Sequence, residues 1–193
     1  MTIDPIVYSA RPAEKRSPSE DRCYDFLEEQ GISFERVDHE HADTIEACLD
    51  VEKVLGCKIC KNLLLTNRQM TDLYLLLMPG DKPFRTKFLS RQLGCARLSF
   101  ATPEQMLAHL GVTPGSVSLL GLIQDKDHAV RLLIDNDLLS DEYLGCHPCM
   151  NTSSLKLRME DVLKKIIPAT GHGLPMSISP GTPRRHDKCP VGH

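Results

Sequence analysis

The chain has 193 residues, of which 41% are hydrophobic and 25% charged, and its formal net charge is −3. This length and composition predict one soluble globular domain and exclude wholesale disorder. No apolar run reaches the roughly 18 residues of a membrane span, and no secretory signal is visible, so we expect a cytoplasmic protein that contacts no membrane. With no tryptophan, four tyrosines and five phenylalanines, a base-stacking platform for single-stranded nucleic acid is not expected.

Capping residues and hydrophobic periodicity predict interspersed helices and strands. After an arm over residues 1–16, Ser17 caps a helix that Gly31 ends, a strand runs into His39, and Thr44 caps a second helix. The later elements, in chain order, are an antiparallel hairpin buried on both faces (Asn62–Thr66 and Leu73–Met78), a helix (Thr86–Gly94), a short strand (Arg97–Ala101), a helix (Thr102–Gly111), two strands (Val117–Ile123 and Val130–Ile134), a terminal helix (Leu157–Ile167) and a mobile tail (Pro168–His193). Because tight turns join several strands, we expect one α/β domain over residues 17–167 with a mixed, largely antiparallel sheet flanked by helices.

Lysine and arginine are concentrated in two stretches that contain no acidic residue. Residues 54–71 hold three cations and residues 82–97 hold five: Lys58, Lys61, Arg68, Lys82, Arg85, Lys87, Arg91 and Arg97. Each stretch is either a solvated helix face or a local contact to phosphate. The second interpretation is compatible with a net negative chain, because counterion release depends on the contacts made and not on total charge.

Two C-x-x-C pairs, Cys57/Cys60 and Cys146/Cys149, are the most conspicuous cysteine pattern. Without an export signal, the eight cysteines indicate free or metal-bound thiols in a reducing compartment. Two such pairs can build a zinc site, but 85 residues (61–145) separate the inner cysteines, and thiols at positions 57 and 60 of a strand would point apart. Structural thiols are favoured over a zinc site and over redox chemistry, and we expect activity without a metal.

Several familiar catalytic motifs are missing from the sequence. There is no G-x-S-x-G elbow, no P-loop, no G-x-G-x-x-G and no H-E-x-x-H, which weakens serine-hydrolase and nucleotide-motor interpretations. Lys61 stands at the mouth of an apolar strand, where a lysine either reaches the surface or holds an anion in a cleft. Gly115-Ser116 forms a turn whose amides could face a ligand oxygen, and His147-Pro148 forms a turn that carries polar groups.

Six segments, taken together and in order, resemble the YbaK/ProX superfamily of aminoacyl-tRNA deacylases, and most of all its ProXp-ala branch. They are FLEEQGISFERVDHEH, CKNLLL, MPGDKPFRTK, SFATPEQMLAHL, GVTPGSVSLLGL and HPCMNT. The resemblance runs from about Ser19 to Ile167. Its most specific parts are K-N before an apolar strand, P-G-S-V-S-x-x-G-L, and H-P-x-x-N-T.

The resemblance implies a single domain with a curled, mixed sheet that hydrolyses the ester between a wrong amino acid and tRNA. ProXp-ala members clear alanine from proline tRNA after its release from the synthetase, whereas YbaK-type members clear cysteine. Catalysis in the family needs no metal or other cofactor and uses the terminal ribose hydroxyl of the substrate. The expected partners are therefore mischarged tRNA and prolyl-tRNA synthetase, and not DNA.

The resemblance also implies a set of site residues. Catalytic roles fall to Lys61, Asn62 and His147. Substrate binding is expected of His39, Gly115, Ser116, Gly145, Pro148 and Asn151, with backbone donors from the Gly115-Ser116 and Gly145–His147 turns. The basic stretches would hold the acceptor stem through Lys58, Lys82, Arg85, Lys87 and Arg91.

Three alternatives stay open. Cys146 stands where the family pattern has an aromatic residue or a glycine, so the amino acid removed could be another, such as cysteine. The chain could also be a non-catalytic relative that binds tRNA or an amino acid and regulates, although Lys61 in its K-N context argues against this. A zinc-stabilised binding module built on the two C-x-x-C pairs is the third.

Overall fold

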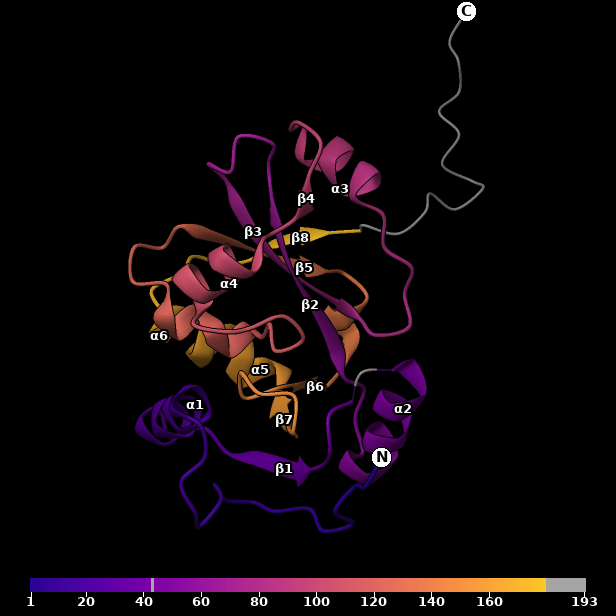
Figure 1. The fold of residues 1–193 in the computed structure, drawn as a ribbon, viewed down its shortest axis with the longest axis vertical. Helices are drawn as coiled ribbons and strands as arrows, with labels where there is room; N and C mark the ends of the chain where they lie inside the picture. Colours follow the sequence, from indigo (N-terminus) through magenta and orange to yellow (C-terminus); the bar gives the residue numbers. More distant parts are fainter. Residues whose placement is uncertain (43, 180–193) are drawn as a thin grey trace, which may run out of the picture.

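The computed structural model of the chain describes residues 1–42 and 44–179, whose strands form two sheets (Figure 1). The first has five strands in the order β4-β2-β3-β5-β8, and the second has three in the order β1-β7-β6. The strands are β1 (Phe34–Asp38), β2 (Cys60–Thr66), β3 (Leu73–Pro79), β4 (Ser99–Phe100), β5 (Val130–Asp135), β6 (Tyr143–Cys146), β7 (Ser153–Arg158) and β8 (Met176–Ile178). The helical segments are α1 (Pro18–Glu29), α2 (Ile45–Leu55), α3 (Thr86–Leu93), α4 (Pro103–Leu110), η1 (Leu119–Gln124), η2 (Leu138–Ser140), α5 (Met159–Asp161), η3 (Val162–Ile166) and α6 (Ile167–Ala169).

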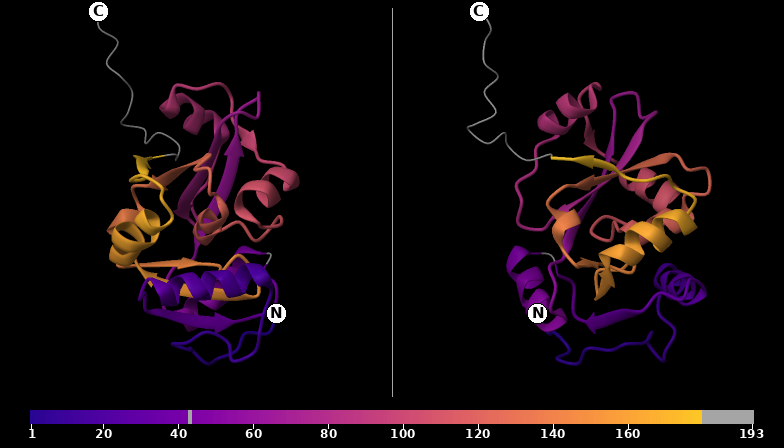
Figure 2. Two further views of the ribbon diagram at one scale, coloured as in Figure 1. Left: turned by 90° about the vertical axis from the view of Figure 1, so that its left-hand side faces the viewer. Right: turned by 180° about the vertical axis from the view of Figure 1, so that it is seen from behind.

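The predicted fold class is confirmed, with one difference in architecture. Strand pairs β2–β3, β2–β4, β1–β7 and β6–β7 are antiparallel, whereas β3–β5 and β5–β8 are parallel. The curl of the sheets is slight, and helices flank them (Figure 2). The sequence predicted a single sheet, but the second sheet is separate and joins the first through a parallel bridge between Ile59 and Gly145.

Local capping chemistry fixes the starts of three helices as the sequence predicts. The side chains of Ser17, Thr44 and Thr102 each accept a hydrogen bond from the third amide that follows them, which satisfies an amide that the first helical turn leaves unpaired. Thr102 and Gln105 complete a reciprocal capping box.

The β2–β3 hairpin is buried on both faces, as its apolar runs predict. Leu64, Leu75 and Leu77 face the main core, which fills the space between the two sheets together with α1, α4 and the η3 segment. Residues on the opposite face of the hairpin, such as Leu65 and Leu76, pack against α3 in a second core. A third, smaller cluster joins α2 to β1 and to Ile59, so that α2 is held beside the start of β2.

Two stretches depart from the predicted secondary structure. Val117–Ile123 is predicted as a strand, but the hydroxyl of Ser118 accepts a hydrogen bond from the Leu120 amide and the chain turns into η1. A short apolar run does not by itself distinguish a strand from a buried helical turn. The tail predicted from Pro168 starts too early, because Met176–Ile178 pairs with β5 as β8; residues 180–193 lie outside the described residues.

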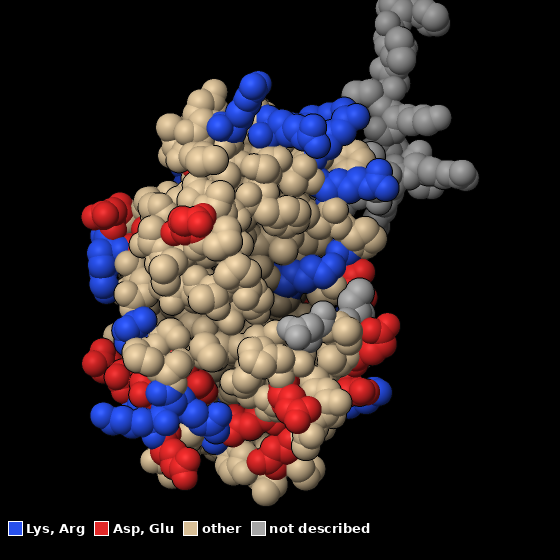
Figure 3. All heavy atoms as spheres, in the orientation of Figure 1, with Lys and Arg blue, Asp and Glu red and all other residues tan. Residues whose placement is uncertain are grey.

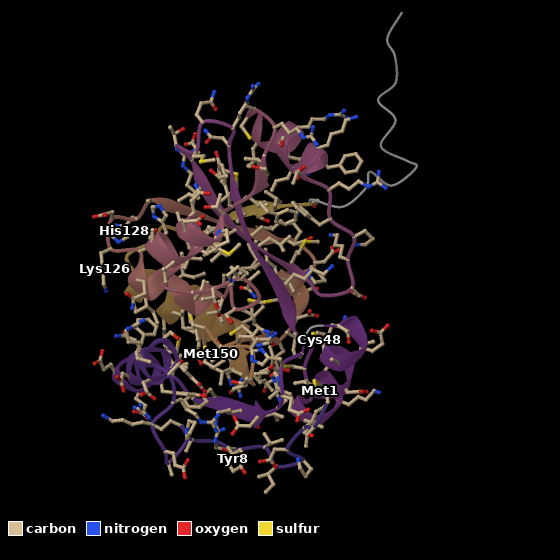
Figure 4. All side chains as sticks on the ribbon, in the orientation of Figure 1. Met1, Tyr8, Cys48, Lys126, His128 and Met150 are labelled. Carbon is tan, nitrogen blue, oxygen red and sulfur yellow. The ribbon has the colours of Figure 1, made fainter. Side chains whose placement is uncertain are left out.

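The predicted arm, residues 1–16, lies along β1. Ile3 bridges to His39 and Tyr8 bridges to Arg36, and the Arg36 guanidinium stacks over the Tyr8 ring at 4.5 Å from its centroid. Tyr8 is labelled beneath β1 in Figure 4. Among the described residues, no helix has the length and apolar character needed to cross a membrane.

Candidate active site

A cavity of about 530 Å³ lies where the start of β2 meets α2, β4 and the loop before η1. Its polar and charged lining residues include Glu52, Lys58, Lys61, Asn62, Asp81 and His147, and its apolar lining residues include Ala42, Leu49, Ile59, Leu63, Phe100, Met106 and Val117. Cys48, which is labelled in Figure 4, lines the cavity from the α2 side. Segments far apart in sequence therefore meet here, and they include the K-N and H-P motifs.

Lys61 enters the cavity from β2. Its position in the strand places it opposite Met78, and its ammonium donates a hydrogen bond of 2.8 Å to the Lys82 carbonyl oxygen. Within residues 1–42 and 44–179, no carboxylate lies within ion-pair distance of this ammonium. Lys61 is thus a half-buried cation that is held by one neutral acceptor, which suits an anionic or strongly polar ligand oxygen.

Asn62 connects β2 to the start of η1. Its carbonyl oxygen accepts a hydrogen bond of 2.9 Å from the Leu119 amide, and its side-chain amide donates to the Cys60 carbonyl oxygen at 3.2 Å. These bonds fix the loop that carries Val117 into the cavity wall. The geometry gives Asn62 a positioning role beside the catalytic role predicted for it.

His147 is held in one tautomer. Its Nδ1 lies 3.0 Å from the carbonyl oxygen of Ser153, and because a carbonyl oxygen only accepts, Nδ1 carries the hydrogen. Burial lowers the pKa of His147, so the ring is neutral near pH 7 and its Nε2 is an acceptor. Since His147 lines the cavity, a proton acceptor and the Lys61 cation are part of one site.

His39 lies behind His147 and not on the cavity wall. The two rings are 6.2 Å apart between centroids, and Ser154 lies between them, with its hydroxyl oxygen 2.9 Å from His39 Nε2 and 3.5 Å from His147 Nδ1. His39 Nδ1 donates to the Glu40 carbonyl oxygen at 2.7 Å, and burial lowers the pKa of His39. His39 therefore supports the His147 loop and does not face the cavity.

Of the predicted substrate-binding residues Gly115, Ser116 and Gly145, only Gly115 lines the cavity. Gly115 lines the cavity, with a φ of +86° that favours glycine. The amide of Ser116 is bonded to the Thr113 carbonyl oxygen, so Ser116 is not the amide donor that was predicted. The amide of Gly145 is likewise bonded to the Lys58 carbonyl oxygen, and a Cβ at Gly145 would lie 2.5 Å from that oxygen. Gly145 therefore lies where the backbones of the two sheets come too close together for a side chain.

Pro148 and Asn151 also lie outside the cavity lining. Both are buried, and the Asn151 side-chain amide donates to the Ala42 carbonyl oxygen at 3.4 Å. The H-P-x-x-N loop is thereby tied to the chain that leads into α2. Their predicted part in substrate binding stays a prediction.

Of the five predicted tRNA-binding cations, four are exposed and one is paired with carboxylates inside the protein. Arg85, Lys87 and Arg91 are exposed on and before α3, at the end of the molecule where Figure 3 shows Lys and Arg gathered. Lys58 is exposed at the cavity. Lys82 differs, because its ammonium lies 2.8 Å from both the fully buried Asp135 carboxylate and Asp137, so its charge is already matched inside the protein.

The four cysteines of the C-x-x-C pairs are thiols in a packed environment. Cys60, Cys146 and Cys149 are buried and Cys57 is half-buried. Burial raises the pKa of Cys57 and of Cys60 to about 12 and raises that of Cys146, which disfavours the reactive thiolate. Among the described residues, no group of three or more His, Cys, Asp or Glu side chains is arranged to hold a metal ion.

Several site residues were missed or misplaced by the sequence analysis. Leu49 of α2 was not predicted as a site residue from the sequence, yet it is 46% exposed and lines the cavity. Ser153 and Ser154 carried no signal, because their function depends on the pairing of β7 with β6 and β1. Phe100, 58% exposed at the cavity mouth, was passed over because exposure cannot be read from an isolated aromatic residue.

Comparisons with known proteins agree on one family. A model of the aminoacyl-tRNA editing domain matches residues 39–165. The prolyl-tRNA editing protein ProX of Acetoanaerobium sticklandii is 31% identical over 148 residues, which cover 76% of this chain and 88% of that protein. Prolyl-tRNA synthetase associated domain-containing protein 1 of Mus musculus is 31% identical over 145 residues, covering 73% and 85%. The crystal structure of a candidate trans-editing enzyme for prolyl tRNA synthetase is similar in fold, with a TM-score of 0.64, 19% identity, and coverage of 87% and 99%.

Proposed function

Because the chain belongs to the aminoacyl-tRNA editing domain family, we propose that it hydrolyses the ester of alanine mischarged onto proline tRNA. The ProX relative is named for prolyl-tRNA editing, which supports the choice of tRNA. The reaction adds water across the ester, so that the amino acid leaves with a carboxylate and the tRNA keeps its terminal hydroxyl.

The observation that carries the proposal is the meeting of Lys61 and His147 in one cavity. The two residues are 86 positions apart. Among the described residues, the Lys61 cation is held by a single neutral acceptor, and the neutral His147 imidazole has no partner at Nε2, which can therefore accept a hydrogen bond. An activated ester needs a positioned water and stabilisation of the oxyanion more than it needs strong acid or base. This pair meets both needs.

In the proposed mechanism, the Lys61 ammonium binds the ester carbonyl oxygen and stabilises the negative charge that develops on it. His147 Nε2 takes a proton from the attacking water as the new C–O bond forms. When the ester bond breaks, the neighbouring ribose hydroxyl of the substrate passes its proton to the leaving oxygen and takes one back from His147, and the second water proton leaves to solvent as the carboxylate forms. Among the described residues, nothing lies within 4 Å of where a Cβ of Gly115 would be, so the space beside this cavity residue is open to the substrate.

The apolar wall of the cavity favours a small uncharged side chain. Leu49, Ile59 and Val117 line it, and such a wall gives a charged amino acid no partner. Alanine is smaller than proline, so rejection of the correct amino acid is steric, and steric exclusion can exceed the roughly 1–3 kcal/mol that one methylene of attraction provides. Cysteine, which is also small, is the competing substrate.

The test is release of amino acid from a panel of purified mischarged tRNAs, with alanine, cysteine and proline each esterified to proline tRNA. We expect fast release of alanine and retention of proline. Faster release of cysteine than of alanine would show that cysteine, and not alanine, is the amino acid removed. Binding of tRNA without release from any member of the panel would favour the non-catalytic relative. Association with prolyl-tRNA synthetase is a further part of the proposal, supported by the name of the mouse relative.

A further inference from the structure

Phe100 lies between the candidate active site and a second depression. It lines the 530 Å³ cavity and also a groove whose lining includes Asn67, Arg68, Thr86, Arg97 and Ser99. This groove lies between the β2–β3 turn, the start of α3 and β4. A ligand that occupies both depressions at once would therefore lie beside Phe100.

The Phe100 ring is exposed although its backbone is fixed. The residue is 58% exposed, but it pairs with Leu65 across β4 and β2, and the Ala101 amide that follows donates to the Leu64 carbonyl oxygen at 2.9 Å. Phe84 contacts the ring in an edge-on arrangement, with centroids 6.2 Å apart. A supported ring of this kind gives contact area at a low cost in conformational entropy.

The groove beside Phe100 is positively charged. Arg68 and Arg97 line it without any Asp or Glu in its lining, and neither guanidinium has a carboxylate within ion-pair distance among the described residues. Arg85 and Lys87 are exposed nearby at the start of α3. Unpaired guanidinium groups in a groove suit a chain of phosphates.

From this arrangement we propose that Phe100 stacks on the terminal nucleobase of the unpaired 3′ end of tRNA, while Arg68 and Arg97 bind the phosphates that precede it. The inference rests on the proposed function, because the esterified ribose must then lie in the cavity beside Lys61 and His147. The small number of aromatic residues predicts no base-stacking platform for a single strand. One exposed ring beside a basic groove is nevertheless enough to stack one base.

The experiment compares Phe100→Ala, Phe100→Leu and Phe100→Tyr in steady-state deacylation of alanyl-tRNA for proline. Loss of stacking should raise KM by about 5- to 150-fold in Phe100→Ala with little change in kcat. Phe100→Tyr should restore KM, whereas Phe100→Leu, which keeps apolar area without a ring, should not. Leu107→Ala, which removes a 62% exposed side chain of α4 that lines neither depression, is the matched control and should behave as wild type.

The arginines have a separate readout. Arg68→Ala and Arg97→Ala should each reduce the salt dependence of tRNA binding by about 0.7 in the slope of log K against log salt concentration, as expected for one lost contact to a single strand. Phe100→Ala should weaken binding without changing that slope. Equal salt slopes in all the variants would overturn the assignment of the groove to phosphates.

Two outcomes separate this inference from the proposed function. If wild type releases alanine and Phe100→Ala keeps its KM, the stacking site is wrong and the proposed function stands; loss of prolyl-tRNA synthetase binding in that variant would mark Phe100 as a protein contact instead. If wild type releases no amino acid, the proposed function fails, and the affinity of Phe100→Ala for uncharged tRNA then decides the inference. An affinity equal to that of wild type would refute it.

Discussion

Replacement of Lys61 by alanine tests the site most directly. The ammonium is held by one carbonyl oxygen at 2.8 Å, so its loss removes a hydrogen bond worth about 0.5–1.5 kcal/mol to the fold. Its expected contribution to the reaction is larger. A unit charge about 4 Å from an oxyanion contributes about 4 kcal/mol at an effective dielectric constant of about 20, and loss of one oxyanion donor lowers kcat by about 10²- to 10³-fold.

The assay is single-turnover release of alanine from alanyl-tRNA for proline, with thermal unfolding measured on the same sample. Lys58→Ala is the matched control, because Lys58 also lines the cavity but is exposed. We expect the Lys61 variant to lose about 10²- to 10³-fold in rate with a melting temperature lowered by about 1–6 °C. The Lys58 variant should mainly raise the enzyme concentration that gives half of the maximal single-turnover rate. A Lys61 variant with normal melting and a rate within threefold of wild type would refute the oxyanion role.

Three further changes probe the support of the site. Burial lowers the pKa of His147, so the folded chain excludes a proton that the unfolded chain takes up. The contribution of His147 to the free energy of unfolding should therefore be constant above about pH 6.5 and fall as the pH drops below it. His147→Gln should reduce this pH dependence in thermal unfolding between about pH 5 and 8, and the part that remains is assigned to His39, whose pKa burial also lowers. Gly145→Ala would place a Cβ 2.5 Å from a backbone oxygen and should destabilise the fold by about 1–3 kcal/mol or more in urea titration. Gly173→Ala, whose Cβ would meet nothing within 4 Å in the part of the chain that the structure describes, should be close to neutral. Lys82→Ala leaves the fully buried Asp135 without its cation and should cost about 3–5 kcal/mol of stability. A Lys82 variant that melts normally but binds tRNA weakly would instead support the tRNA-binding role predicted from the sequence.

The sequence by itself determined the features whose causes are local. Helix starts at Ser17, Thr44 and Thr102 follow from a hydroxyl that accepts an amide three residues later, and this depends on neighbours in the chain alone. The hairpin of β2 and β3 follows from two apolar runs joined by a polar turn. The family resemblance is also local, because it rests on short motifs at set distances, and it is confirmed by the match over residues 39–165.

Tertiary structure decided what depends on contacts between distant segments. The sequence placed Lys82 with the tRNA-binding cations, but only the folded chain brings it to Asp135, 53 residues away. Likewise, Gly145 and His39 belong to the motifs of the site. The bridge to Ile59 places Gly145 between the two sheets, and the pairing of β1 with β7 places His39 behind His147. The motifs predict which residues lie near the site. Whether a side chain faces the cavity or packs behind it depends on strand register, because a shift of one residue turns a side chain to the other face of the sheet.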